Sequence, residues 1–162
     1  MNFSLSADDL AGYLARQVSN FFPDHEVGTF DYRPFMDDTL QRVEYCFSAL
    51  KNKYFPGNGG AYFNHCHTDQ YAMFLYLISN TIYRAQGNRA LAEKAYALNK
   101  ALHGLDVFYE IELPEIFGFQ HPVGTVLGRA TYGNYFFVYQ RCSTGAKDGI
   151  YPRLGEGVVM YG

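Results

Sequence analysis

The chain of 162 residues is long enough to bury a core in one domain or two small lobes, and it is too short for a large multidomain enzyme. Hydrophobic residues make up 48% of the sequence, which favours a compact, soluble fold over a disordered segment. Lys and Arg number 13 against 16 Asp and Glu, without a basic run, so nucleic acid is not expected as a partner.

The sequence has no features of a membrane or secreted protein. Its longest purely apolar stretches are only a few residues, and the segment MNFSLSADDL lacks the basic and apolar regions of a signal peptide. The three cysteines are an odd number, which favours free thiols in a reducing compartment. We therefore expect a cytoplasmic protein without disulfides and without a membrane partner.

The first part of the sequence predicts helices in succession. Ser6 is a suitable N-cap for a first helix, which has apolar residues every three or four positions and ends near Pro23. A second helix is expected at about 37–54, where the breaker cluster FPGNGG follows. Thr68 opens a third helix that is apolar nearly all the way round, with its C-cap expected at Gly87.

A fourth helix is expected from Asn88 to Gly104, and the composition changes after it. Gly, Val, Tyr, Phe and Thr replace Glu, Ala and Lys, and several glycines directly follow an aliphatic or aromatic residue. This pattern indicates short strands separated by tight corners. Repeated about every six residues, such units build a parallel β-helix; their irregular spacing here leaves an antiparallel sheet as the alternative.

The segment NHCHTD, before the third helix, places four possible zinc ligands within five positions: His65, Cys66, His67 and Asp69. A spacing of two does not put ligands on one helix face, and no second Cys or His pair lies nearby to complete a tetrahedral site. We therefore favour a hydrogen-bond network at the start of the helix and expect no metal. The glycine-rich FPGNGGAYF lacks the Lys-Ser or Lys-Thr of a phosphate-binding loop.

An ordered series of motifs in the later part of the chain resembles one known family. The string HPVGTVLGRATYG begins at His121 and is close to the pattern His-x-x-Gly-x-Val-x-Gly-x-x-Ala, with Ala130 one place early. The string VYQRCSTG and an element from Pro152 to Val158 follow it, and QGNRALA precedes it. Over about residues 60–162, these motifs resemble the serine acetyltransferases, which are hexapeptide-repeat acyltransferases.

The resemblance implies an α+β fold. A helical N-terminal domain, 1–113, would be followed by the first coils of a left-handed parallel β-helix, 114–162. A coil takes about three hexapeptides, so these residues supply fewer than three coils, and the β-helix is expected to be incomplete. The resemblance also implies O-acetyl transfer with acetyl-CoA as co-substrate, and a homo-oligomer that is a trimer or a dimer of trimers.

In this family the general base is a histidine, and its position in the motif falls on His121. Imidazole suits the role because its ordinary pKa lies nearest neutral pH. The acid that orients the base in the family has no counterpart, since Ile111 stands at its position. Glu112 is our first choice for the missing carboxylate, and Glu110 and Glu115 are the alternatives.

Three further positions depart from the family at its acceptor site. Gln120, Arg129 and Tyr151 replace groups that recognise free serine, and they suit a sugar-type hydroxyl acceptor. Backbone donors at a glycine corner such as Gly145 are expected to stabilise the oxyanion of the acetyl group. The sequence thus predicts an O-acetyltransferase acting on serine or, preferably, a sugar-type acceptor. A non-catalytic assembly or binding module is the alternative, favoured by the missing acid and the short β-helix.

Overall fold

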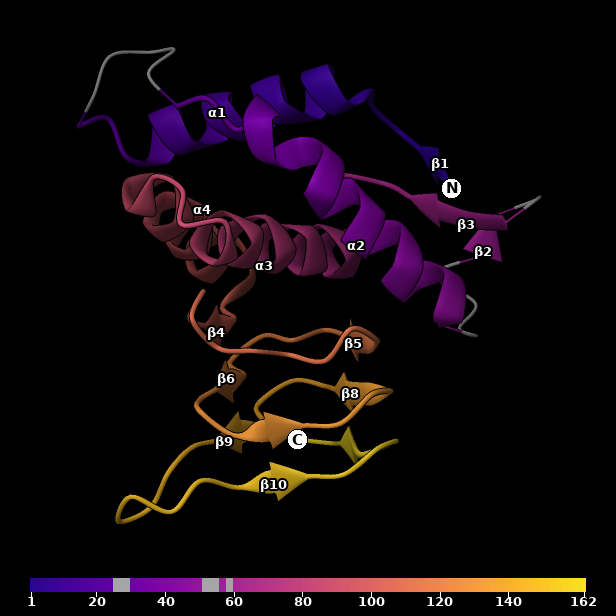
Figure 1. Ribbon diagram of the computed structural model, residues 1–162, viewed down its shortest axis with the longest axis vertical. Helices are drawn as coiled ribbons and strands as arrows, with labels where there is room; N and C mark the ends of the chain where they lie inside the picture. The colour runs from indigo at the N-terminus through magenta and orange to yellow at the C-terminus, as the bar shows by residue number, and fades with distance from the viewer. Residues whose placement is uncertain (25–29, 51–55, 58–59) are drawn as a thin grey trace.

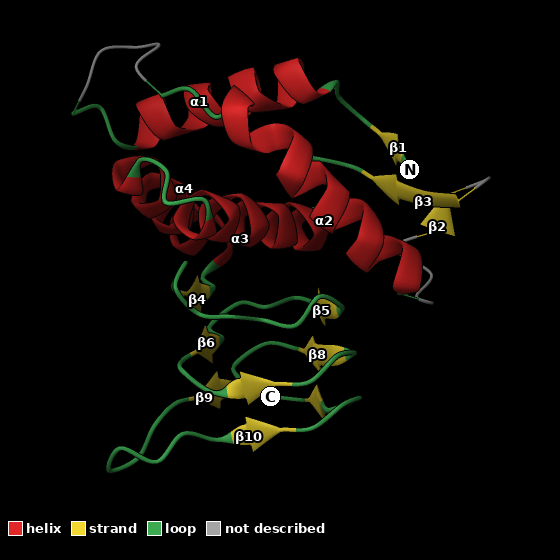
Figure 2. Ribbon diagram, in the orientation of Figure 1, coloured by secondary structure: helices red, strands yellow, loops and turns green. Residues whose placement is uncertain are grey.

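The computed structural model describes residues 1–24, 30–50, 56–57 and 60–162 and has an α+β fold. The helices gather in one part of the molecule, and short strands stack beyond them in successive coils (Figure 1). The same division is visible when the chain is coloured by secondary structure (Figure 2). The helices are α1 (Ala7–Phe21), the 3-10 helix η1 (Arg33–Phe35), α2 (Met36–Ala49), α3 (Thr68–Arg84) and α4 (Arg89–His103).

Capping groups fix the boundaries of α1 and α4. Ser6 Oγ accepts the backbone N–H of Asp9 at 3.2 Å, and Asn88 Oδ1 accepts that of Ala90 at 3.0 Å. Each bond satisfies an N–H that has no partner inside its helix. Gly104 ends α4 in the left-handed conformation, with φ 61°. These predicted boundaries are confirmed.

The predicted C-cap of α3 is wrong. The helix ends at Arg84, and Gln86 takes the left-handed conformation with φ 52°. The N–H of Gly87 donates to the carbonyl of Ile82 at 2.9 Å. Gly87 therefore takes part in the end of the helix one position after the left-handed residue. Its lack of a side chain serves packing instead, because a Cβ there would lie 2.7 Å from the ring of Phe35.

A small sheet that the sequence did not predict accompanies the helices, so this part is not purely helical. It consists of β1 (Asn2–Phe3), β2 (Pro56–Gly57) and β3 (Gly60–Phe63). β1 runs parallel to β3, and β2 runs antiparallel to it. Next to this sheet, α2 ends at Ala49, earlier than predicted, and the further stretch expected at 51–54 lies outside the described residues.

Helix α3 forms the centre of the helical part. Every residue from Asp69 to Ile82 is buried, as its apolar positions on all sides predict. It packs against α4 on one side and α2 on the other. Asn99 of α4 donates from Nδ2 to the carbonyl of Ala72 at 2.9 Å, which satisfies a buried polar side chain between the two helices. In the described part of the chain, no helix has the length and apolar character needed to cross a membrane.

The strands after α4 form three sheets, one for each side of the coils. The first contains β4 (Asp106–Val107), β6 (Val126–Leu127) and β9 (Ser143–Thr144). The second contains β5 (Phe117–Phe119), β8 (Phe136–Val138) and β11 (Val159–Met160). The third contains β7 (Thr131–Tyr132) and β10 (Arg153–Leu154). Each strand lies beside the equivalent strand of the next coil.

All pairings between these strands are parallel, so the antiparallel alternative is wrong for the coils. The register stacks apolar side chains inside the coils: Phe117 pairs with Phe136, and Val107 with Leu127. The first strand of the coils, β4, begins at Asp106, inside the domain 1–113 expected to be helical, because α4 ends at its glycine cap and the chain turns directly into the first coil. The left-handed sense of the coils stays a prediction.

The first coil is bonded to the helical part through buried polar groups. Tyr76 Oη of α3 donates to the carbonyl of Ile111 at 2.8 Å and accepts the N–H of Leu113 at 2.9 Å. The carbonyl of Gly104, directly after α4, accepts the N–H of Gly124 from the second coil at 2.9 Å. The helices thus cover one end of the stack and satisfy backbone groups there.

Stacking of the coils requires a glycine at position 133. A Cβ on Gly133 would lie 2.6 Å from the backbone nitrogen of Glu156 in the next coil, whereas a Cβ on Gly155 meets nothing within 4 Å. We expect Gly133→Ala to lower the free energy of unfolding by about 1–3 kcal/mol, the usual range for overpacking. Denaturant titration measures this, with Gly155→Ala as the matched control. Equal loss in both variants would contradict the stacking shown here.

His103 should make stability depend on pH. Burial lowers its pKa from 6.5 to about 4, and its Nδ1 lies 2.8 Å from Asn99 Oδ1. Between these pH values the unfolded chain takes up a proton that the folded chain does not, so stability falls as the pH drops from about 6.5 towards 4. We expect His103→Gln to flatten this part of the melting-temperature profile. A profile as steep as that of the wild type would assign the effect to other groups.

Candidate active site

His121 lies at the corner that joins the first coil to the second, in the turn between β5 and β6. We call this place, together with the equivalent turn between β8 and β9, the His121 corner. The residue has φ 48°, an uncommon backbone conformation for a residue with a side chain, and Pro122 follows it. Its side chain is 70% exposed, so the imidazole can reach a molecule in solvent. Such strained and accessible positions are typical of functional sites.

The carboxylate beside His121 comes from the helical part. Asp69, in the first turn of α3, accepts the backbone N–H of His121 on Oδ1 at 3.0 Å. Its Oδ2 lies 3.9 Å from His121 Nδ1. The Asp69 side chain is only 8% exposed, and the start of a helix stabilises a negative charge. Asp69 therefore holds the strained backbone of His121 and faces its imidazole with the other oxygen.

The acids chosen from the sequence lie elsewhere. Glu112 accepts from Asn80 Nδ2 at 3.5 Å, and Glu110 pairs with Arg89 at 3.0 Å and with Arg129 at 3.4 Å. Glu115 lines a separate cavity between α2 and α3. None of these contacts involves His121, whereas Asp69, read from the sequence as part of a helix start, does contact it. The two residues are 52 positions apart, and only the packing of α3 on the coils brings them together.

The other predicted site residues divide between two corners. Gln120 adjoins His121, and its N–H donates to the carbonyl of Val138 at 3.0 Å. Arg129 and Tyr151 line a cavity of about 560 Å³ at the turn that follows β6 and β9, which we call the Arg129 corner. Gly145 also follows β9 and lies at that corner. One chain therefore does not bring Arg129, Tyr151 and Gly145 to the base.

The NHCHTD segment forms a hydrogen-bond network at the start of α3. His65 Nδ1 lies 2.8 Å from Ser4 Oγ, and its Nε2 lies 3.3 Å from Cys66 Sγ. The N–H of Cys66 donates to Asn64 Oδ1 at 2.9 Å. Within the described part of the chain, no group of three or more His, Cys, Asp or Glu side chains is placed to hold a metal ion.

Comparisons with known proteins give structural relatives only, since no family model and no curated protein matches the sequence. Serine acetyltransferase from Neisseria gonorrhoeae, in complex with serine, superposes with a TM-score of 0.66 at 19% identity, covering 93% of this chain and 66% of that one. The Vibrio cholerae enzyme gives 0.65 at 15% identity, covering 93% and 61%. Isoform 3 from Entamoeba histolytica, in complex with cysteine, gives 0.62 at 17%, covering 94% and 57%.

The chain thus spans between 57% and 66% of the length of these relatives. At 15–19% identity, the likeness concerns the fold, and it agrees with the resemblance read from the motifs around His121. Over almost its whole length, the chain has the fold of the serine acetyltransferases.

Proposed function

We propose that this chain belongs to an acyltransferase that moves an acetyl group from acetyl-CoA to a hydroxyl group of a small molecule. The observation that carries the proposal is the pairing of an exposed His121 with a buried Asp69. An imidazole beside a carboxylate is the arrangement that activates a hydroxyl nucleophile. The structural likeness to serine acetyltransferases supports the same class of reaction.

In this reaction His121 takes the proton of the acceptor hydroxyl, and the oxygen attacks the carbonyl carbon of the thioester. The carbon–sulfur bond then breaks, and His121 returns the proton to the leaving thiolate, which gives an O-acetyl ester and free CoA thiol. Asp69 faces Nδ1, which favours a proton on that nitrogen and leaves Nε2 free as the base. The 3.9 Å gap between Asp69 Oδ2 and Nδ1 is of the kind that closes when a substrate binds.

The acceptor is inferred from the ligands of the structural relatives and from the residues at which this chain differs from the family. Relatives are described in complex with serine and with cysteine, and nothing in the comparisons supports a sugar-type acceptor. Tyr151 and Gln120 nevertheless replace the groups that, from the resemblance, are expected to recognise free serine. We therefore propose a small hydroxyl compound as acceptor, with serine as the first to be tested and sugars as the comparison.

The two corners favour a site formed between subunits. Arg129 lies at the next corner of the coil after β6, and Tyr151 lies at the equivalent corner one coil later, so both are on the other edge of the β4–β6–β9 sheet from His121. A second copy, rotated about an axis parallel to the stack, can present its Arg129 corner to the His121 corner of the first. Cyclic assembly repeats this contact and completes every site. We propose a homotrimer on this ground.

Three single substitutions test the assignment of the base and its partner. His121→Ala should lower the rate of acetyl transfer about a hundredfold or more, the usual contribution of a general base. Asp69→Asn keeps the size of the side chain and removes its charge, so it should lower the rate about tenfold or more and change the pH dependence of the rate. Thiol release from acetyl-CoA measures both effects.

Glu112→Gln is the matched control, because it removes a carboxylate that contacts Asn80 instead. We expect a rate close to that of the wild type. A larger loss in this variant than in Asp69→Asn would reverse the assignment of the two acids. Complete absence of thiol release by the wild-type protein with all acceptors would favour the non-catalytic module, which the separation of the two corners also allows.

Complementation tests the shared site. His121→Ala and Tyr151→Ala should each be inactive alone, while a trimer assembled from both should regain activity. Random mixing leaves about a quarter of the sites with an intact pair when the two residues come from neighbouring subunits of a ring. Activity is measured after the two variants refold together, and the variants mixed after folding separately are the control. No recovery on refolding together would place both residues in a site within one chain.

A further inference from the structure

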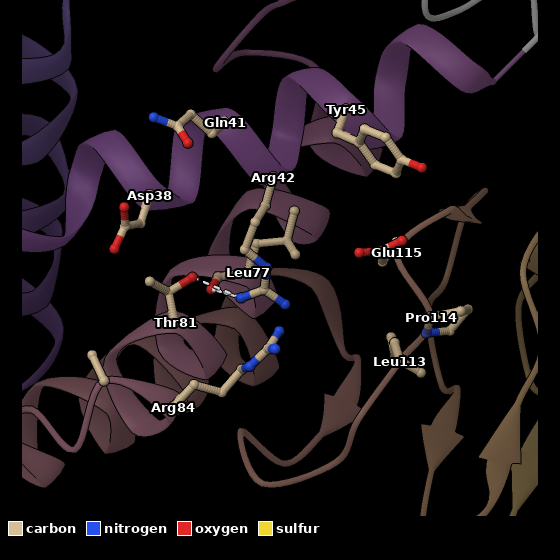
Figure 3. A pocket seen from close by; sticks show the side chains of 11 residues that line it. Asp38, Gln41, Arg42, Tyr45, Leu77, Thr81, Arg84, Leu113, Pro114 and Glu115 are labelled. Carbon is tan, nitrogen blue, oxygen red and sulfur yellow. Dashed lines mark hydrogen bonds between the residues drawn. The ribbon is translucent and has the colours of Figure 1, made fainter.

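A second cavity lies between the helices and the first coil. It has a volume of about 680 Å³ and is lined by α2, by the later part of α3 and by the segment from Leu113 to Glu115 (Figure 3). Arg84, which lines this cavity, comes fifteen positions after Asp69 in α3, a distance of about 22 Å along the helix. The cavity is therefore separate from the His121 corner.

One of its two arginines is part of the packing between α2 and α3. Arg42 Nη1 donates to Thr81 Oγ1 at 2.7 Å and to the carbonyl of Leu77 at 3.3 Å. Its Nη2 donates to Asn80 Oδ1 at 2.7 Å. Burial lowers the pKa of Arg42 and is the largest influence; the positive charge of Arg84 also lowers it, while Tyr76 and Glu112 act in the opposite direction without cancelling the fall. Burial and the neighbouring Arg84 thus disfavour a positive charge at this place, and a further negative group in the cavity would stabilise it.

The other arginine is not used by the fold. The side chain of Arg84 is exposed and makes no hydrogen bond or ion pair with any residue that the structure describes. Figure 3 shows its guanidinium extended towards that of Arg42 in the wall of the cavity. Two neighbouring guanidinium groups repel each other, and a carboxylate between them removes the repulsion and accepts several hydrogen bonds.

The rest of the lining sets the charge and shape of a ligand. Asp38 and Glu115 bring two negative charges to the walls, so the lining carries as many carboxylates as guanidinium groups. A multiply charged anion would be repelled by these acids, whereas a molecule with one carboxylate and one ammonium group satisfies both sets. Leu113, Pro114 and the 55% exposed ring of Tyr45 offer apolar surface to the body of the ligand.

We propose that this cavity binds a zwitterionic carboxylate of the amino-acid class that has an apolar side chain. Its carboxylate would lie between Arg42 and Arg84, its ammonium group would face Glu115, and its apolar side chain would contact Tyr45 and Pro114. The proposal concerns binding and does not depend on the reaction at His121.

Three probes that share one side chain but differ in charge test the ligand class. L-Phenylalanine has both charges, phenylalaninamide lacks the carboxylate, and 3-phenylpropanoate lacks the ammonium group. L-Leucine, its amide and its deaminated acid repeat the series with an aliphatic side chain. Calorimetric titration of the full chain with each compound, and with inorganic phosphate, measures the affinities. We expect at least one of the two amino acids to bind at least tenfold more tightly than its amide, its deaminated form and phosphate.

Variants then locate the site. Arg84→Gln removes a guanidinium that the fold does not use, so the variant should keep its helical content and bind the amino acid at least tenfold more weakly. Glu115→Gln should weaken binding of the amino acid and leave binding of the deaminated acid unchanged. Arg16→Gln, which removes an exposed charge on α1 at the same cost in net charge, is the control and should bind as the wild type does.

Each contrary result overturns the proposal. Tightest binding by phosphate or by the deaminated acids would make the cavity a plain anion site. Undetectable binding of both amino acids at millimolar concentration would exclude the ligand class. Equal weakening by Arg84→Gln and Arg16→Gln would place the binding elsewhere in the molecule.

Discussion

The bond from the backbone N–H of His121 to Asp69 joins the two parts of the molecule at the site proposed for catalysis. It depends on the packing of the first coil against α3, which Tyr76 secures by donating to Ile111 and accepting from Leu113. It also depends on the burial of α3, because a helix held on every side presents its first turn at a fixed place. The geometry of the base is therefore a property of the interface between helices and coils.

Local chemistry in the sequence predicted the helices well. Ser6, Asn88 and Gly104 act through bonds to residues at most four positions away, so their effect can be read without knowing the fold. The coils were predicted by the motif after His121, and the sheets confirm their parallel pairing. The sheet formed by β1, β2 and β3 was missed because its pairing joins the two-residue strand at Asn2 to a strand some sixty positions later.

The candidate site was predicted only in part, for the same physical reason. His121 carries its own motif, but Asp69 has no local mark that separates a catalytic carboxylate from an ordinary helix start. Glu112 was preferred because it flanks Ile111, which stands at the position of the family's acid, and the turn of the first coil directs it to Asn80. Gln120 lies at a different corner of the coils from Arg129 and Tyr151. Which corner a residue occupies depends on the exact length of every strand and turn before it, and these lengths are known only from the structure.

The contact between Gly104 and Gly124 has a consequence for the order of folding. The residue that ends α4 also supplies a carbonyl to the second coil, so the finished helical part offers a preformed edge on which coils can pair. In stacked repeats each unit is stabilised chiefly by its neighbours, and growth from a stable end is favoured over nucleation elsewhere. The helices are also synthesised first. The coils of this chain should therefore assemble vectorially, each one on the template left by the one before it.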